Sequence, residues 1–327
     1  AIFRGAYVWH SVALTSAWGI VISGIVQLGA LYWAAHRAGV APHLVRPSFS
    51  KDIRGLMRRM GPGLVGSGVT QMNLMVDTII ATRLPVGSPS ILYFADRINQ
   101  LPLGVLGAAA GTTLLPLLTR HVANNDRASV HASLNRALDY ALLLTLPAAM
   151  GLIALAPSIM AGLFSYGHFT VADALKSAQS LRAYALGLPA FVLIKVFSPG
   201  FFAEGDTSTP VRIGFFTLGL NLALNLALYK PLAHVGPPLA STIAAVVNVS
   251  ILAVLLHRRG IFQPDPRLKS RSARIIGASL MMALWVAAAQ KFAAPDLPNW
   301  HGIWRPSMLG ALIAFGGAAY AISLDAL

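Results

Sequence analysis

The sequence predicts an all-α, polytopic membrane protein. Of its 327 residues, 56% are hydrophobic and only 11% are charged, whereas about 25% of the residues in a soluble domain are charged. The mean hydropathy is +0.65. Apolar runs of about 20 residues, long enough to cross a hydrocarbon core of about 30 Å, recur along the chain. Helices satisfy their own backbone groups, and the alternating pattern of a membrane barrel is missing.

Nine such runs predict about nine membrane-spanning helices. They occupy residues 11–34, 61–84, 91–118, 135–156, 178–203, 211–231, 237–257, 273–292 and 304–324. The second run is the least apolar, because Asp77, Arg83 and several glycines interrupt it. Glycine and proline are tolerated in a spanning helix where neighbours or water satisfy the backbone. This run therefore predicts a bent helix that lines a cavity.

The basic residues predict the topology. Sixteen of the 25 lysines and arginines fall in, or within two residues of, the four loops that precede the second, fourth, sixth and eighth runs, and seven lie on the opposite side. The positive-inside rule places the larger set in the cytoplasm, so the chain is expected to start outside and end inside. The net charge of +14 thus reflects topology and does not indicate nucleic-acid binding.

The sequence does not favour an enzyme. It has no Walker loop, HExxH, GxSxG or metal-spaced histidine cluster, and Glu204 is its single glutamate. Little is left for catalysis by paired carboxylates. Without cysteine, disulfides and thiolate metal sites are excluded as well. Function is therefore expected from the few polar groups inside the apolar runs.

Arg97 is the leading candidate among those groups. A charge at bilayer depth costs at least about 2.5–3.5 kcal/mol, so it usually faces a wet cavity or a partner. The planar guanidinium matches phosphate geometry and suits an anionic headgroup. The alternative is an ion pair with Asp96 or Asp77, although adjacent helical residues point about 100° apart. Asp96 and Lys195 complete the substrate-binding candidates, and Lys195 has the alternative of extending to the membrane edge.

A pair of asparagines forms the second candidate site. Asn221 and Asn225 are four residues apart and share one helix face. Their oxygens, together with the carboxylate of Asp77, have the chemistry to coordinate a hard cation. The alternative is hydrogen bonding between helices, worth about 0.6 kcal/mol per contact in membranes.

Several motifs resemble those of a known family. They are Met60–Pro62, Tyr93–Arg97, Leu101–Gly107, Gly111–Pro116, Phe164–Thr170, Pro199–Ala203 and Gly205–Val211. In this order they resemble the MurJ (MviN) lipid II flippases of the multidrug/oligosaccharidyl-lipid/polysaccharide exporter superfamily. Members of this family have two six-helix lobes and a terminal pair of helices. The chain looks like the sixth span onward, and the first residue, which is not methionine, also suggests a piece of a longer protein.

The resemblance implies a division into four parts. Residues 1–35 would form the last helix of the amino-terminal lobe, and residues 36–60 a basic cytoplasmic linker with an amphipathic helix. Residues 61–257 would form the six-helix carboxy-terminal lobe. Residues 258–327 would form a terminal two-helix element that, with the glycine-rich second helix, makes a groove for the undecaprenyl tail.

The resemblance also implies the roles of individual residues. Arg97 matches the cavity arginine of the carboxy-terminal lobe, which is thought to contact the lipid II pyrophosphate. Sodium, as a coupling or structural ion, would be the single cofactor. Its implied ligands are Asp77, Asn221 and Asn225, with Ser241 or Thr242 near a further ligand. The family can place an acid at the position of Asn225, so sodium binding is expected to be weaker here.

The implied function is translocation of lipid II from the inner to the outer leaflet of the bacterial cytoplasmic membrane, by alternating access. The implied partners are lipid II, membrane lipids and proteins of peptidoglycan synthesis, with no nucleic acid. Two alternatives are kept: a cation-coupled drug or polysaccharide-lipid exporter of the same superfamily, and a membrane scaffold without transport.

Overall fold

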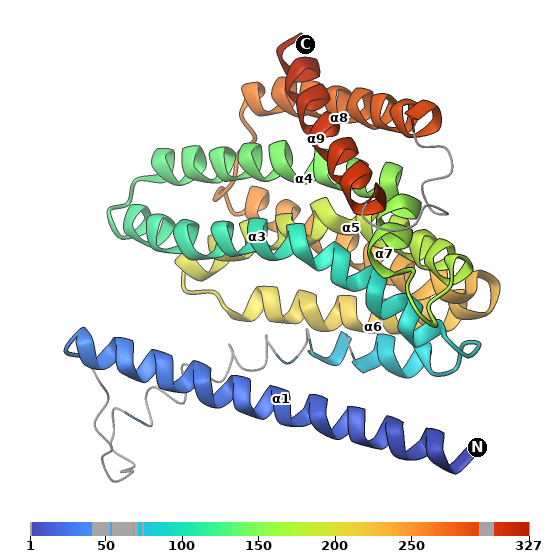
Figure 1. Cartoon of the computed structure of the whole chain (residues 1–327). Coiled ribbons are helices and arrows are strands. Elements are labelled where there is room, and N and C mark those ends of the chain that lie inside the picture. Colours follow the sequence, from blue (N-terminus) through green and yellow to red (C-terminus); the bar gives the residue numbers. More distant parts are fainter. Residues whose placement is uncertain are drawn as a thin grey trace. The chain divides into compact units, whose positions relative to one another are not determined.

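The computed structural model describes residues 2–40, 53, 68, 71–73, 75–293 and 304–326. These residues form helices and connecting turns without a strand, which confirms the all-α prediction (Figure 1). The helices are α1 (Ile2–Arg37), α3 (Ser88–Ala123), α4 (Arg127–Phe164), α5 (Val171–Ala203), α6 (Ser208–Leu232), the short 3-10 helix η1 (Ala233–Val235), α7 (Gly236–Arg258), α8 (Pro266–Ala293) and α9 (Trp304–Ala326). Each long helix contains one predicted apolar run, and most extend it into polar flanking residues.

Two predicted elements are described only in part. Within the run at 61–84, residues 68, 71–73 and 75–81 are helical, and we call residues 75–81 the Asp77 segment. The amphipathic helix expected near 50–60 is described only at Ile53, so it stays a prediction.

Six stretches of the described chain are long and apolar enough to cross a membrane. They are Ala17–Arg37, Arg127–Phe164, Val171–Ala203, Ser208–Arg258, Pro266–Phe292 and Pro306–Ala326. The fourth stretch runs through α6, η1 and α7, so it contains two of the predicted spans. This length and composition suit a multi-pass membrane protein, while the spans expected at 61–84 and 91–118 stay predictions.

The chain divides into two compact units, Ala1–Met57 and Arg58–Leu327. In the first unit, α1 exposes large apolar side chains along its described length, including Trp18, Ile20 and Leu28. An apolar helix of this kind is suited to contact with lipid or with other helices. The division into four parts implied by the resemblance is not tested by this result.

Helix α5 is the centre of the second unit. It packs against α3, α4 and α7, while α8 packs along α4 and α9 packs on α8 (Figure 1). Two apolar cores surround opposite halves of α5. One joins its first half to α3, α4, α8 and α9 through residues such as Leu181 and Met160. The other joins its second half to α3, α4 and α7 through residues such as Phe201 and Leu256.

The contact between α5 and α7 depends on a glycine. The hydroxyl of Thr242 on α7 donates to the carbonyl of Ala183 on α5 at 2.7 Å. A Cβ atom at Gly187 would lie 2.5 Å from Oγ1 of Thr242 and 3.1 Å from its Cα atom. Small residues at helix interfaces allow this close approach in membranes.

We predict that Gly187→Ala destabilises the protein, because the backbone of α7 has to move away from α5. We expect a fall of several degrees in the melting temperature in detergent, measured by intrinsic tryptophan fluorescence. Gly219→Ala on α6 is the matched control, since a Cβ atom there meets nothing within 4 Å. Equal melting temperatures for the two variants would contradict the packing argument.

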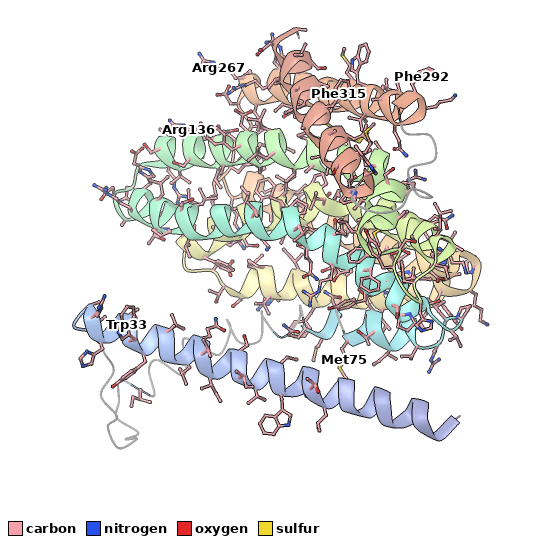
Figure 2. The ribbon with its side chains drawn as sticks, in the orientation of Figure 1. Trp33, Met75, Arg136, Arg267, Phe292 and Phe315 are labelled. Atoms are coloured by element: carbon pink, nitrogen blue, oxygen red, sulfur yellow. The ribbon has the colours of Figure 1, made fainter. Side chains whose placement is uncertain are left out.

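Ion pairs join the helix ends on one side of the second unit. Arg127 pairs with Glu204 at 2.5 Å, Arg259 with Asp206 at 2.7 Å, and Arg271 with Asp139 at 2.6 Å. Arg136 and Arg267 lie at this same side, whereas Phe292 lies at the opposite end of α8 (Figure 2). The basic residues therefore gather at one end of the bundle, as a positive-inside distribution requires.

Asp206 organises the turn between α5 and α6. Its carboxylate accepts from the backbone N–H of Thr209 at 2.9 Å and from the Arg259 guanidinium at 2.7 Å. Burial opposes ionisation, but the hydrogen bonds from Thr209 and Arg259 outweigh it and lower the pKa of Asp206 to about 2. The ionised carboxylate therefore stabilises the folded state.

This shift predicts a pH dependence. Because the folded-state pKa is depressed, the contribution of Asp206 is complete above the ordinary carboxyl pKa of about 4 and is lost as the pH falls towards about 2. We expect Asp206→Asn to lower the melting temperature near neutral pH, and this deficit to shrink below about pH 4. The exposed Asp325 on α9 supplies the control Asp325→Asn. A deficit for Asp206→Asn that does not change with pH would be inconsistent with this assignment.

Candidate functional site

Arg97 lies on the open face of α3. The helix follows Gly87, whose φ of 94° lies in the left-handed region that favours glycine. Ala95 and Ile98 are buried in the core that α3 shares with α4 and α5. Burial of these two residues turns the intervening Arg97 outward, next to the exposed Leu101. The packing of α3 thus leaves the Arg97 side chain exposed on a largely apolar helix.

Tyr93 positions the Arg97 guanidinium. Nε of Arg97 donates to the Tyr93 hydroxyl at 3.2 Å. The guanidinium carbon lies 5.1 Å from the centre of the same ring, within the range of a cation–π contact. A guanidinium has five N–H donors, and this arrangement engages the single one on Nε. The four donors on the two Nη atoms form no hydrogen bond with a described residue, and the exposed side chain can offer them to an oxyanion.

Asp96 does not pair with Arg97. Its carboxylate accepts from the side-chain amide of Gln100, one turn further along α3. Within the described part of the chain, the three ion pairs are those at the helix ends, and none involves Arg97. The geometry therefore favours the predicted anion contact of Arg97 over the alternative of a local ion pair. The hydrogen-bond partner of Asp96 is Gln100.

Lys195 lies apart from Arg97. Its side chain is exposed on α5, and it contacts Gly107, ten residues beyond Arg97 on α3. No described carboxylate forms an ion pair with it. The structure thus presents one cation on α3 and a second on α5, and does not combine the three substrate-binding candidates into a single cluster.

Four of the five predicted ion ligands do come together. The side-chain amide of Asn225 donates to one oxygen of Asp77 at 3.0 Å, and Ser241 donates to the other at 3.0 Å. Asn221 donates to the Ser241 hydroxyl at 3.0 Å. This polar cluster joins the Asp77 segment to α6 and α7. Asn221 and Asn225 are 2% and 0% exposed, whereas Asp77 and Ser241 are only partly buried.

Thr242 faces a different helix. Its hydroxyl donates to Ala183 of α5, as described above, while the adjacent Ser241 faces Asp77. The sequence left a choice between these two neighbours as the further ligand, and the structure brings Ser241 to the cluster. Neighbouring helical residues point about 100° apart, so only one of them can reach it.

The polar cluster has the donor chemistry of a hard-cation site. The amide nitrogen of Asn225 is surrounded by oxygens: Oδ1 of Asp77 at 3.0 Å, and the carbonyl and side-chain oxygens of Asn221, each at 3.1 Å. Oδ1 of Asn225 is buried and has no hydrogen-bond partner among the described residues. Carboxylate, amide, carbonyl and hydroxyl oxygens are ligands that a hard cation accepts. Among the described residues, no group of three histidines or acids provides another metal site.

Residues that follow Arg97 on α3 line an apolar groove. It has a volume of about 350 Å³ and is lined by α3, α4 and α9. Ile98 and Leu101 contribute the α3 side, and Leu309 and Ile313 contribute the α9 side. No residue of α8 lines it. The groove predicted between the terminal pair of helices and the glycine-rich second helix stays a prediction, and the groove described here is lined by α9 together with α3 and α4.

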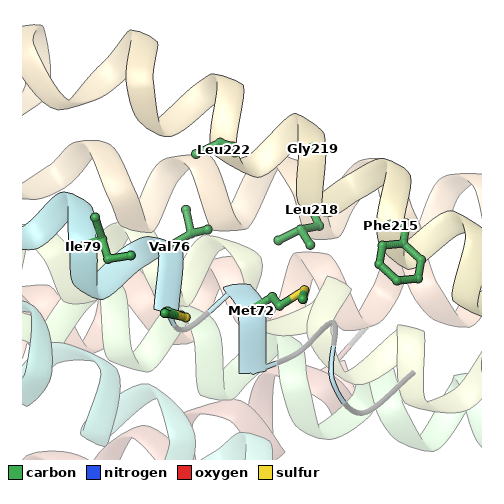
Figure 3. A pocket seen from close by; sticks show the side chains of 8 residues that line it. Met72, Val76, Ile79, Phe215, Leu218, Gly219 and Leu222 are labelled. Atoms are coloured by element: carbon green, nitrogen blue, oxygen red, sulfur yellow. The ribbon is translucent and has the colours of Figure 1, made fainter. Parts of the chain in front are cut away.

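A second apolar groove, of about 380 Å³, lies between α6 and the helical residues around the Asp77 segment (Figure 3). Met72, Val76 and Ile79 face Phe215 and Leu218 across it. Its lining carries no charged side chain. Such a surface suits hydrocarbon, while Asp77 of the same segment is held in the polar cluster.

Tyr93, Gln100 and Gly107 make contacts at these sites that were not predicted from the sequence. Tyr93 precedes Arg97 by four residues and Gln100 follows Asp96 by four, a spacing that places each pair on one helix face. Both contacts could have been predicted from this spacing. The contact between Gly107 and Lys195 joins two helices, and the sequence gives no signal for it.

The comparisons with known proteins agree with this geometry. Residues 2–298 match the family model described as lipid II flippase MurJ. The chain is 37% identical over 303 residues to a probable lipid II flippase MurJ of Rhizobium meliloti (strain 1021). The matched region covers 89% of this chain and 56% of that protein. The chain thus spans little more than half the length of this relative.

Two solved structures have the same fold. A lipid II flippase MurJ in an inward closed conformation matches with a TM-score of 0.67 and 25% identity, covering 85% of this chain and 55% of that one. An outward-facing multidrug resistance MATE transporter of the MOP superfamily matches with a TM-score of 0.56. At 18% identity, with 82% of this chain and 63% of that one covered, this second match shows the fold alone.

The family model covers most of the chain, and the Rhizobium relative exceeds 30% identity over nearly nine-tenths of it. The chain therefore belongs to the MurJ family of lipid II flippases.

Proposed function

We propose that this chain is the carboxy-terminal part of a transporter that moves lipid II from the inner to the outer leaflet of the bacterial cytoplasmic membrane. Because the chain spans 56% of its Rhizobium relative, the activity belongs to a protein with an additional amino-terminal part. The end of the bundle that carries the ion pairs would face the cytoplasm, together with the carboxyl terminus. Proteins of peptidoglycan synthesis are the proposed partners beyond lipid.

One observation carries this proposal: the residues that follow the outward-facing Arg97 on α3 line an apolar groove. Lipid II combines a pyrophosphate with a long prenyl chain, so its carrier needs a cation next to a surface for hydrocarbon. Arg97 offers its Nη donors, and the next residues, Ile98 and Leu101, line the groove. A carrier of soluble cations would need the opposite charge at this position.

Alternating access requires rigid parts that move about the site. The two apolar cores around α5 make the second unit such a part. Prolines occur inside α3, α4 and α5, where each removes a backbone hydrogen bond and permits a bend. Movement of this unit relative to an amino-terminal lobe would expose the Arg97 face to each side of the membrane in turn.

We predict that Arg97→Ala abolishes flipping without loss of expression, because a charge-assisted hydrogen bond to phosphate contributes about 1.5–3 kcal/mol. The assay measures lipid II exposure on the outer leaflet of cells depleted of their own flippase. The protein tested is the chain extended at its amino end to the length of a relative. Arg136→Ala, at the end of the bundle, is the matched control and should retain flipping.

Normal lipid II exposure with Arg97→Ala would refute the proposed role of Arg97. Arg97→Lys refines the test, since lysine keeps the charge but loses the planar fork of donors. We expect activity between that of the wild type and that of Arg97→Ala.

We propose further that sodium binds at the polar cluster, as a coupling or structural ion. Asp77, Asn221, Asn225 and Ser241 would hold it, and the bound ion would supply a positive charge that neutralises Asp77. The unpartnered Oδ1 of Asn225 supports this proposal, since rotation of the amide would turn that oxygen towards the other oxygens. Sodium then competes with the Asn225 N–H groups, so binding should be weak.

Melting temperatures in sodium and in potassium chloride of equal ionic strength test this site. A ligand that binds only the folded state raises the melting temperature. We expect a small rise in sodium for the wild type, a larger one for Asn225→Asp because of its added negative charge, and none for Asp77→Asn. Identical melting temperatures in both salts for all three proteins would exclude the sodium site.

A further inference from the structure

Helix α4 contains two prolines, and each one leaves a backbone carbonyl without its helical donor. In a helix, the N–H of one residue donates to the carbonyl four residues earlier, and proline has no N–H. Pro147 therefore frees the carbonyl of Leu143. Pro157 frees the carbonyl of Ile153 in the same way. In hydrocarbon, a freed carbonyl has to find another donor.

Side chains of two other helices supply these donors. The Tyr320 hydroxyl of α9 donates to the carbonyl of Leu143 at 2.9 Å. Nε of Arg182 on α5 donates to the carbonyl of Ile153 at 3.1 Å. Each donor thus reaches the backbone position that the proline four residues later has left open. We call these two hydrogen bonds the proline clamps of α4.

The Tyr320 donor is fixed by packing. Its ring is only partly exposed, and it packs against the apolar core that joins α9 to α4, α5 and α8. Two dihedral angles place a tyrosine side chain. The hydroxyl therefore cannot leave the Leu143 carbonyl unless the ring leaves the core.

The same face of α4 fastens the rest of the chain's terminal part. The Asn135 side-chain amide donates to the carbonyl of Gln263 at 2.8 Å, just before α8 begins. Asp139 pairs with Arg271 of α8 at 2.6 Å. Asn135, Asp139 and Leu143 follow one another at intervals of four residues, so they lie along one face of the helix. The Tyr320 clamp therefore continues a line of polar contacts that ties α8 and α9 to α4.

The prolines of α3 and α5 differ from those of α4. Pro102 frees the carbonyl of Ile98 on α3. Pro189 frees the carbonyl of Ala185 on α5. No described side chain donates to either carbonyl, whereas both freed carbonyls of α4 have a donor. A bend is free to change only where no third group holds the freed carbonyl in place.

We infer that Tyr320 and Arg182 are positioning residues that replace the missing backbone donors and fix the bends of α4. Helix α4 is then a rigid strut, and bending is left to α3 and α5. This gives α9 a role beyond lining the apolar groove. The clamps are independent of the proposed function, and only their effect on transport rests on it. A unit that bent at α4 would transmit less of its movement to the Arg97 face.

The distance between two spin labels on α4 tests the Tyr320 clamp. Because the chain has no cysteine, Ala132→Cys and Leu163→Cys introduce one label pair at exposed positions. The pair spans both prolines, about 46 Å apart along a helix. In the extended protein, freed of other cysteines, we expect a narrow distance distribution for the wild type and a broader one for Tyr320→Phe. Tyr140→Phe, at an exposed position of α4, is the matched control and should keep the narrow distribution.

Pro147→Ala shows whether the hydroxyl acts through the freed carbonyl. Alanine restores the backbone N–H that Leu143 lacks, so the Tyr320 hydroxyl should become dispensable. We expect Tyr320→Phe combined with Pro147→Ala to regain the narrow distribution. Arg182→Met combined with Pro157→Ala repeats the test at the second clamp. Equal widths for the wild type and Tyr320→Phe would overturn the clamp. A broad distribution that Pro147→Ala does not reverse would assign Tyr320 to packing alone.

Lipid II exposure in flippase-depleted cells, at equal protein amount, tests the effect on transport. We expect Tyr320→Phe to be about two- to tenfold slower, as for a lost hydrogen bond, and the double variant with Pro147→Ala to recover. A wild-type rate in spite of broadened distances would overturn the effect on transport. Normal exposure with Arg97→Ala would instead refute the proposed function, while the label distances would still decide the clamp.

Discussion

In hydrocarbon, every polar group on a helix must find a partner, reach water or extend to the membrane edge, and this constraint governs the described structure. Hydroxyl groups between helices donate to backbone carbonyls, as Ser177 does to Ile91 and Tyr320 to Leu143. The carboxylate of Asp77 receives donors from α6 and α7. Arg97 and Lys195 are exposed cations that form no ion pair with a described acid. We therefore expect function from the polar groups that no described residue neutralises.

Helix α5 takes part both in the rigid apolar cores and in the exposed face that carries the cations. Its buried faces join α3, α4 and α7 through two apolar cores and through the close approach at Gly187. Its exposed Lys195 reaches α3 at a second glycine, Gly107. The same helix thus fixes the frame and carries a cation to the open face of α3. Movement as a rigid body would carry Arg97 and Lys195 together, at a constant separation.

The sequence predicted the helices and the chemistry of both sites, because apolar run length and charge at bilayer depth are local properties. The i, i+4 spacing of Asn221 and Asn225 predicted their shared face, and the structure adds the hydrogen bond from Asn225 to Asp77. Contacts between helices could not be predicted. Three features depend on how the helices rotate and cross, which composition does not encode. They are the choice of Ser241 over Thr242, the contact between Gly107 and Lys195, and the groove formed by α9 with α3 and α4.

The central claim is that the Arg97 face of α3 borders water and not lipid, and thiol accessibility tests it most directly. The chain contains no cysteine, so a single substitution introduces one reactive thiol into this part of the extended protein. Gly104→Cys lies on the exposed side of α3, and Met75→Cys lies in an apolar groove. The account predicts that a membrane-impermeant maleimide labels Gly104→Cys and not Met75→Cys. Equal resistance of both thiols to labelling, from either side of the membrane, would contradict it.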